Sequence, residues 1–234
     1  MNTKRLESSK IKRLLKKKPV MTTETFEVAL FPIPNMVTFP GAVVPLHIFE
    51  PRYRTMVEEC VENARMIAVC HTKKQISPAK LDQSITDVLS TNQATYSPRD
   101  VFCAGYCSVS DRTVDGRIYL TIKMLHRVRL GQETQTLPYR IANCTTLVDD
   151  IIDSSAMSDH QSKIVDSIHQ LIKTRAPSEA AKFDKQKWLS LNPAEFSFNV
   201  FQVLRFESEL MQTMLEMTDP EARLQLISKT LSSR

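Results

Sequence analysis

The most informative stretch of the sequence spans residues 31–53 and reads FPIPNMVTFPGAVVPLHIFEPRY. Apolar and other residues alternate between Val44 and Ile48, which is the period of a half-buried strand. Pro45 within this alternation is typical of an edge strand, because proline donates no backbone hydrogen bond. Pro51 then stands where a helix can begin without losing a hydrogen bond. The stretch predicts an irregular edge strand that turns directly into a helix.

The helix predicted after Pro51 is amphipathic, and strands surround it. Its apolar residues recur at helical spacing, and they are Tyr53, Met56, Val57, Cys60 and Val61. Residues 72–99 are polar and predict a long loop with one or two helical turns around Leu81–Leu89. Asp115-Gly116 supplies the turn of a clear hairpin. The predicted strands are Phe26–Phe31, Val44–Ile48, Met66–Cys70, Val101–Val109, Ile118–Leu130 and Tyr139–Val148.

The hydrophobic period changes from strand-like to helical at about residue 150. A capping residue, a first-turn proline and an acid predict one helix start at Asn192-Pro193-Ala194-Glu195, and that apolar helix is expected to continue through Leu215. Another start is predicted at Thr218-Asp219-Pro220-Glu221. The chain therefore divides into an α+β arrangement of three segments. These are a basic, disordered tail (1–22), a β domain (23–150) and a helical bundle (151–234).

The charge is distributed unevenly along the chain. The net charge of +5 separates into +7 for residues 1–18 and −2 for the remainder. A mildly acidic body argues against a nucleic-acid-binding surface. Met21 is an alternative start of translation. No apolar run approaches the roughly 20 residues of a membrane span, and no signal-peptide core is present, so we expect a cytoplasmic protein.

The sequence offers no recognisable catalytic or cofactor motif. It lacks GxxxxGK[ST], GxSxG, HExxH and GxGxxG, and only four glycines are available for phosphate loops. Cys70 and His71 are adjacent on a predicted strand and would point to opposite faces. Cys103 and Cys107 would lie about 13 Å apart, too far to share one metal ion. We therefore expect free buried thiols, no metal, no cofactor and no enzymatic activity.

Residues 31–53 closely resemble the opening of the N-terminal domain of Lon proteases, which has the pattern F-P…V…F-P…P-L-x-I-F-E-P-R-Y. The resemblance runs from about Phe26 to the C-terminus. Met124 departs from it, since the family usually has glycine there, and residues 72–99 are longer than the common connection. Further matching segments are Asp115-Gly116-Arg117, Arg127-Val128-Arg129-Leu130, Pro138-Tyr139-Arg140 and Met214–Leu224.

The resemblance implies a PUA-like antiparallel β-barrel with one amphipathic helix, followed by a helical bundle, and a role in engaging substrates. It does not imply proteolysis, because the chain ends where a Lon protease would continue into its ATPase and peptidase domains. The expected function is a non-catalytic module or adaptor that binds unfolded or partly folded polypeptides, with a protease or chaperone as a further partner. The alternative is an RNA-associated protein, since PUA-like barrels also occur in RNA-binding proteins.

An exposed strand edge and the junction between the two halves are the natural peptide grooves, because edge pairing gives affinity without demands on sequence. The candidate peptide-binding residues surround the strand-to-helix corner. A structural role at this corner, with Glu50 and Arg52 bracing it, is the alternative explanation for each of them. The candidates are Pro45, Leu46, His47, Ile48, Phe49, Glu50, Arg52 and Tyr53.

Overall fold

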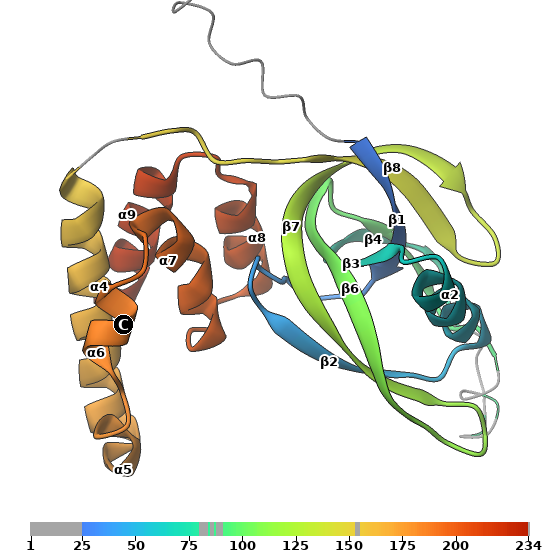
Figure 1. The fold of residues 1–234 in the computed structure, drawn as a ribbon, viewed down its shortest axis with the longest axis horizontal. Helices are drawn as coiled ribbons and strands as arrows, with labels where there is room; N and C mark the ends of the chain where they lie inside the picture. The colour runs from blue at the N-terminus through green and yellow to red at the C-terminus, as the bar shows by residue number, and fades with distance from the viewer. Residues whose placement is uncertain (1–24, 80–83, 85–86, 88–90, 153–154, 234) are drawn as a thin grey trace, which may run out of the picture.

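The computed structural model describes residues 25–79, 84, 87, 91–152 and 155–233, which form a β-rich part followed by a helical part (Figure 1). The predicted tail 1–22 and the alternative start at Met21 lie outside these residues. The elements of the β-rich part are β1 (Thr25–Pro32), β2 (Val43–Ile48), α2 (Pro51–Glu62), β3 (Met66–Cys70), β4 (Thr72–Ser77), β5 (Thr95–Pro98), β6 (Val101–Arg112), β7 (Ile118–Gln135) and β8 (Arg140–Thr146). The helical part contains α4 (Ser155–Arg175), α5 (Pro177–Ala180), α6 (Lys185–Leu189), α7 (Pro193–Asn199), the 3-10 helix η1 (Val200–Gln202), α8 (Ser208–Glu216) and α9 (Pro220–Ser232).

The main sheet has the strand order β2-β7-β6-β3-β1-β8, and β8 also pairs with β7. The long β7 therefore contacts β2 and β6 along its first part and β8 along its second part. The expectation of a purely antiparallel sheet is wrong, because β1 and β3 pair in parallel. Parallel neighbours need a crossover connection, which here includes β2 and helix α2. The predicted α+β class is confirmed, and the sheet contains both parallel and antiparallel strand pairs.

Helix α2 begins at Pro51, as predicted, and covers one face of the sheet (Figure 1). Its buried residues are Tyr53, Met56, Val57 and Cys60. Val61 was expected on the same face but is 51% exposed, so that prediction is wrong for the last turn. The helix ends at Glu62, and Asn63 caps it by donating to the Glu59 carbonyl oxygen.

The prediction of a long loop over residues 72–99 is wrong at both of its ends. Strands β4 and β5 form a separate antiparallel pair, in which Thr72 lies opposite Pro98. Every residue of β4 is exposed or half-buried, so no buried face imposes the apolar alternation that reveals a strand in a sequence. Most of the helical turns predicted at Leu81–Leu89 fall outside the described residues.

Both predicted helix starts in the second part are confirmed. The Asn192 side chain accepts the backbone N–H of Ala194, and the Asp219 side chain accepts that of Ala222. The long helix expected from residue 192 to Leu215 is broken, because α7 ends and residues 203–207 separate η1 from α8. The two pieces have different partners: α7 contacts α9, whereas α8 contacts β6.

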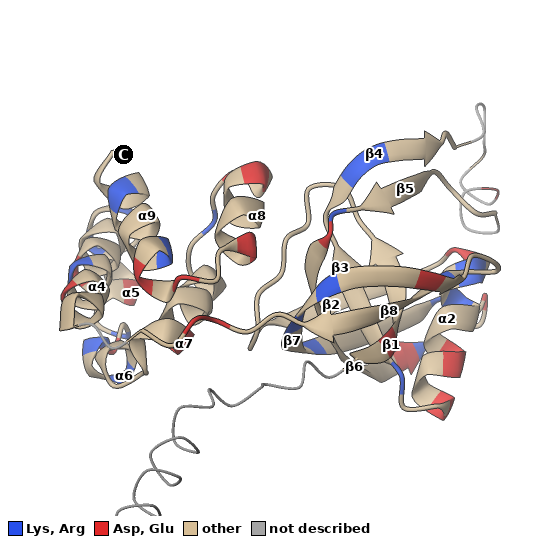
Figure 2. Ribbon diagram, turned by 90° about the horizontal axis from the view of Figure 1, so that it is seen from above, with Lys and Arg blue, Asp and Glu red and all other residues tan. Residues whose placement is uncertain are grey.

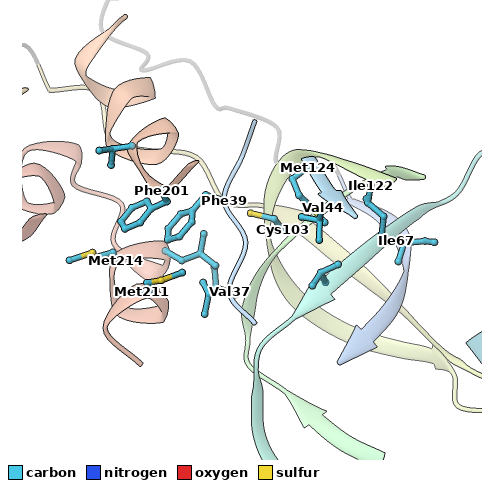
Figure 3. Close-up of a cluster of buried hydrophobic side chains, with 14 of the residues drawn as sticks. Val37, Phe39, Val44, Ile67, Cys103, Ile122, Met124, Phe201, Met211 and Met214 are labelled. Carbon is cyan, nitrogen blue, oxygen red and sulfur yellow. The ribbon is translucent and has the colours of Figure 1, made fainter. Parts of the chain in front are cut away.

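One hydrophobic core extends through both parts of the molecule. The segment between β1 and β2 inserts Val37 and Phe39 between the sheet and the helices, where they lie beside Phe201, Met211 and Met214 (Figure 3). A second, smaller cluster lies on the other side of β1 and β3. Among the described residues, no helix is both long and apolar enough to cross a membrane.

Candidate functional site

A groove of about 490 Å³ opens where the β-rich and helical parts meet. One wall is the segment from Met36 to Pro45, which leads into β2, and the other comes from the end of α7 and from η1. The volume falls within the roughly 300–1,000 Å³ typical of ligand pockets. The helical wall is formed by Phe198, Phe201, Gln202 and Arg205.

The first wall is anchored by the turn Phe39-Pro40-Gly41. The Phe39 ring stacks on the Phe201 ring with a centroid distance of 3.9 Å and an interplanar angle of 8°. Gly41 has a φ of +84°, a conformation that favours glycine, and a Cβ there would lie 2.8 Å from the Asn199 Oδ1 atom. The positive φ thus favours glycine at this turn, and a larger residue would also have to displace the Asn199 side chain.

Within the described residues, strand β2 is an edge strand of the sheet and lies next to the groove. Ala42 accepts the backbone N–H of Met124, and Val43 lies opposite Lys123, so the antiparallel alternation turns the backbone polar groups of Val43, Pro45 and His47 away from β7. Val43 is 62% exposed and lines the groove. Pro45 lacks an N–H at one of the outward positions, which interrupts the row of donors available to an added strand.

The Phe198 wall of the groove rests on two buried arginines. The guanidinium carbon of Arg223 lies 3.7 Å from the Phe198 ring centroid, and that of Arg127 lies 5.1 Å from it. Both guanidinium groups share the Asp149 carboxylate, with Arg127 at 2.6 Å and Arg223 at 2.5 Å. Two buried cations thus face one carboxylate directly behind an aromatic wall.

Other guanidinium N–H groups of these arginines donate to neutral oxygens. Arg127 donates to the carbonyl oxygens of Leu147, Leu215 and Met217, and Arg223 donates to Met217 and to the Ser197 hydroxyl. Burial is the main reason that the pKa of Arg127 is lowered, and the Asp149 carboxylate opposes this effect while Arg223 adds to it. The cluster ties β7, the connection after β8, α8 and α9 together.

A second set of polar contacts holds the segment between β1 and β2, which continues into one wall of the groove. The backbone N–H of Asn35 donates to Nδ1 of the buried His71 at 3.1 Å, so His71 carries its proton on Nε2 and donates to Glu209 at 3.1 Å. Arg99 also binds Glu209, at 2.5 Å. Asn35 itself has a positive φ of 59°. This contact, the His71 latch (Asn35, His71, Arg99 and Glu209), joins the β-rich part to α8.

The candidate residues from the sequence occupy different surroundings. Pro45 lines the junction groove. Pro45, Leu46 and His47 also line a shallower surface of about 310 Å³ that β6 and β7 complete, where the His47 ring stacks on Tyr119 at 4.5 Å. Ile48 is buried in the core, and Phe49 is half-buried with its ring 6.0 Å from that of His47.

Glu50, Arg52 and Tyr53 point into the protein at the strand-to-helix corner. The Glu50 carboxylate accepts from Arg52 and from the Gln93 backbone N–H, and Arg52 donates to Thr95 and to two carbonyl groups of the adjoining segment. Tyr53 packs against Phe31 with a centroid distance of 4.4 Å, and burial raises its pKa to about 12. These contacts give all three a structural role, and the binding role assigned to the eight candidates stays a prediction.

Sequence reasoning missed most of the residues that line the groove. The turn signal of Pro40-Gly41 was recognised, but nothing near Phe39 indicates that it packs on residues about 160 positions later. Phe198 and Phe201 read as ordinary core positions of an apolar helix. No local sequence signal locates them, because apolar residues continue through the helix break after Gln202 that brings η1 beside β2.

The lining of the groove is mostly apolar. Among the described lining residues, Thr38, Gln202 and Arg205 supply the polar side chains, and the rest are apolar or glycine. The described residues contain no group of histidine, cysteine and acidic side chains arranged to hold a metal ion. Desolvation by burial raises the pKa of the nearby Cys103 thiol to about 12, so it is a poor nucleophile.

Comparisons with known proteins place these features in a family. A model of the substrate-binding domain of the ATP-dependent protease La (LON) matches residues 27–233. A Lon protease of Desulfosudis oleivorans is 20% identical over 88% of this chain and 24% of its own length, and Lon protease 1 of Herpetosiphon aurantiacus is 22% identical over 58% and 15%. The chain thus spans about a quarter or less of the length of these curated relatives.

Solved structures show the same fold at low sequence identity. The N-terminal domain of the Mycobacterium avium complex Lon protease superposes with a TM-score of 0.62 at 12% identity, covering 89% of this chain and all of that one. A Lon N-terminal domain protein from Xanthomonas campestris gives 0.51 at 17% identity, covering 88% and 98%. The extent of the family match, together with this shared fold, shows that the chain belongs to the family of Lon substrate-binding domains.

Proposed function

We propose that this protein is a non-catalytic recognition module that binds unfolded or partly folded polypeptides in the junction groove, as an adaptor for a protease or chaperone. Membership of the Lon substrate-binding family supports recognition of substrate polypeptides. The same family relationship supports a PUA-like β-barrel followed by a helical bundle as the finer description of the fold. The observation that carries the proposal is the apolar groove beside the free edge of β2.

The groove suits an extended polypeptide because it combines two kinds of contact. Val43 and the aromatic wall offer apolar surface, while the outward backbone groups of Val43 and His47 can pair with a main chain. The shallower surface beside His47 and Tyr119 is built from the sheet alone, whereas the groove has walls from both parts of the molecule. The candidate residues Pro45, Leu46 and His47 would contact a segment that leaves the groove along β2.

The lining supports binding without chemistry. Among the described lining residues, Thr38 is the only hydroxyl, and no general base accompanies it. Charged side chains of both signs are interspersed over the two parts (Figure 2), which differs from the basic surface that tracks a nucleic-acid backbone.

The test uses the exposed groove residue Val43 and a matched control. Fluorescently labelled α-lactalbumin, kept unfolded by alkylation of its reduced cysteines with iodoacetamide, is titrated with the full chain and followed by anisotropy. Val43→Gln should weaken binding about fivefold, because one apolar contact at an interface centre contributes about 1 kcal/mol. Val114→Gln, at the fully exposed turn of the β6–β7 hairpin, should bind like the parent.

Three results would count against the proposal. If the parent chain shows no detectable binding, the proposed function is wrong. If Val43→Gln binds as tightly as the parent, the groove is not the binding site. ATP-dependent degradation of the labelled protein by the purified chain would contradict its non-catalytic character.

A further inference from the structure

We propose that His71 is a positioning residue of the junction groove, and that a second proton on its ring releases one wall of the groove in mild acid. The protein then binds polypeptide near neutral pH and releases it as the pH falls. This inference rests on the proposed function and adds a means of regulating it. It is carried by one contact, in which the backbone N–H of Asn35 donates to Nδ1 of the buried His71 at 3.1 Å.

The wall that runs from Met36 to Pro45 is tied by hydrogen bonds at two places. Directly before it, Asn35 donates to His71. Further along, the backbone N–H of Gly41 donates to the Met124 carbonyl oxygen. Between these two ties, the segment is held by side chains that are buried in the core. The tie at Met124 is made by backbone groups alone, so the tie at His71 is the one of the two that a change of charge can break.

The contact with Asn35 requires a neutral imidazole ring. Nδ1 accepts a hydrogen bond only while it carries no proton, and both ring nitrogens are donors in the imidazolium form. The Asn35 N–H and an Nδ1–H would face each other over 3.1 Å, so one of them has to move away. Nε2 donates to Glu209 in either form, which keeps the ring beside α8. The second proton therefore displaces Asn35 and the chain that follows it.

The charged groups around the ring act in opposite directions. The Glu209 carboxylate favours the second proton, but it is 66% exposed, and Arg99 also binds it at 2.5 Å. Arg99 and the burial of the ring both oppose the charged form. Lys73 and Asp100, which lie on β4 and directly before β6, pair with each other at 2.6 Å. Because solvent screens the carboxylate and Arg99 shares it, the contact with Asn35 decides which form of His71 the closed wall accepts.

Two further titratable groups adjoin the His71 latch. Glu207, at the start of α8, is exposed to solvent, which screens its charge. Cys70 precedes His71 on the chain, and burial raises the pKa of its thiol well above the usual value, so the thiol stays neutral near and below neutral pH. Neither group places a charge inside the latch.

The turn that contains Asn35 depends on the contact with His71. Asn35 has a φ of 59°, in the left-handed region that residues other than glycine seldom occupy. A second contact, from the Ser208 hydroxyl to the Asn35 side chain, is a longer hydrogen bond of 3.3 Å. Met36 follows directly and lines the groove. Loss of the His71 contact thus frees the chain from Asn35 to Thr38, and the groove loses the shape of this wall.

The experiment measures peptide binding at about pH 7.5 and about pH 5.5, a range in which histidine side chains usually gain their second proton. The probe is a peptide of aliphatic, aromatic, serine and glutamine residues with an acetylated and an amidated end. Its dye keeps the same charge over this range, so nothing in the probe titrates. Binding to the full chain and to three variants is followed by anisotropy.

The three variants separate the proton of the ring from its shape. In His71→Asn, the amide oxygen takes the place of Nδ1 and accepts from Asn35 at either pH. In His71→Gln, the amide reaches towards Glu209 instead, and the acceptor for Asn35 is lost. His126→Asn is the matched control, because His126 is exposed and is not part of the His71 latch.

The parent should bind about fivefold more weakly at the lower pH, because a groove that is closed in about one fifth of the molecules lowers the apparent affinity by that fraction. His126→Asn should show the same loss. His71→Asn should bind equally at the two pH values, and His71→Gln should bind weakly and equally at both. Circular dichroism at each pH checks that every chain is folded.

Nuclear magnetic resonance of the unsubstituted chain tests the latch in the absence of peptide. The nitrogen resonance of Nδ1 in His71 reports the second proton, and the amide resonances of residues 35–38 report the wall. Both should change over the same pH range. This measurement decides the matter even if a variant fails to fold.

The contrary outcomes are distinct from one another. Equal binding by the parent at both pH values would overturn the inference and leave the proposed function standing. A loss of binding in acid that His71→Asn retains would place the titrating group elsewhere and also overturn it, as would protonation of Nδ1 without a change at residues 35–38. Failure of the parent to bind the peptide and unfolded α-lactalbumin at either pH would overturn both the inference and the proposed function.

Discussion

At the scale of single residues, Asp149 links the two parts of the molecule through two arginines. Its two oxygens hold Arg127 of β7 and Arg223 of α9, and Arg127 in turn binds carbonyl groups at the end of α8. Neutralising one member of a buried ion cluster leaves uncompensated charge, which costs more than the direct interaction contributes.

Asp149→Asn should therefore lower the free energy of unfolding by about 3 kcal/mol, because two buried guanidinium groups lose their counter-charge. The measurement is urea denaturation followed by tryptophan fluorescence from Trp188. Asp150→Asn is the matched control, since Asp150 is exposed and accepts only a hydrogen bond from Thr218 among the contacts described, and it should cost less than about 1 kcal/mol. Equal losses in the two variants would contradict the central role of Asp149.

The sequence could predict some of these residues but not their partners. Arg127 was identified by its place in a family-like segment, and Glu50 with Arg52 by their place at a corner. The sharing of one carboxylate by Arg127 and Arg223 depends on residues 96 positions apart in the chain. Local pattern and spacing carry no information about such a contact.

At the scale of elements, β2 is the strand on whose edge the proposed binding depends. Pro45 occupies an outward backbone position, so an added strand meets a missing donor in the middle of the edge. This arrangement protects the edge from pairing with other sheets, at the expense of one hydrogen bond to a bound peptide.

Pro45→Val should tighten binding of the unfolded α-lactalbumin by about threefold, because it restores one backbone donor with a net value of roughly 0.5–1.5 kcal/mol. Anisotropy titration against the parent chain measures this change. Tyr119, which lies on the neighbouring β7, should not need to move for the new contact. Unchanged affinity would show that bound polypeptides do not pair with the edge of β2.

The His71 latch connects α8 to the loop that forms one wall of the groove. The pKa of Glu209 is lowered by its hydrogen bond with His71 first and by that with Arg99 second. A carboxyl group whose pKa is lower in the folded state stabilises the fold above its unfolded pKa, and this contribution disappears as the pH falls through the folded pKa.

Glu209→Gln should therefore lower the melting temperature slightly near neutral pH, and the difference from the parent should vanish between about pH 5 and about pH 3. The effect corresponds to less than about 1 kcal/mol, because Glu209 is largely exposed and solvent screens the pair. Melting curves of both chains at several pH values provide the test. A difference that persists at the acidic end would exclude titration of this carboxylate as the cause.

Elements with strong local signals were predicted well, and those without were not. Capping residues and a first-turn proline lie next to each other in the sequence, so the start of α2 at Pro51 and the caps at Asn192 and Asp219 can be predicted from it. Strands β4 and β5 were missed because they have no strongly buried face, and the break after η1 was missed because apolar residues continue through it. The parallel pairing of β1 with β3 is a property of the crossover rather than of either strand.

At the scale of the whole molecule, the two parts act as one unit because they share a core. Phe39 of the β-rich part stacks on Phe201 of the helical part, and the groove lies along this contact. The division of the chain at about residue 150 describes the change in secondary structure, and the division into separate domains 23–150 and 151–234 stays a prediction. A binding site at the junction requires both parts to be in place.

The proposed function requires that the chain bind polypeptide through apolar and backbone contacts. Labelled unfolded α-lactalbumin and a labelled single-stranded RNA are titrated in parallel at about 50 and about 200 mM salt. Polypeptide binding should fall less than about threefold over this range, whereas an RNA contact with six or more phosphates would weaken roughly a thousandfold. Polypeptide binding that salt weakens only slightly is the predicted result, and salt-sensitive RNA binding without detectable polypeptide binding would contradict the proposed function.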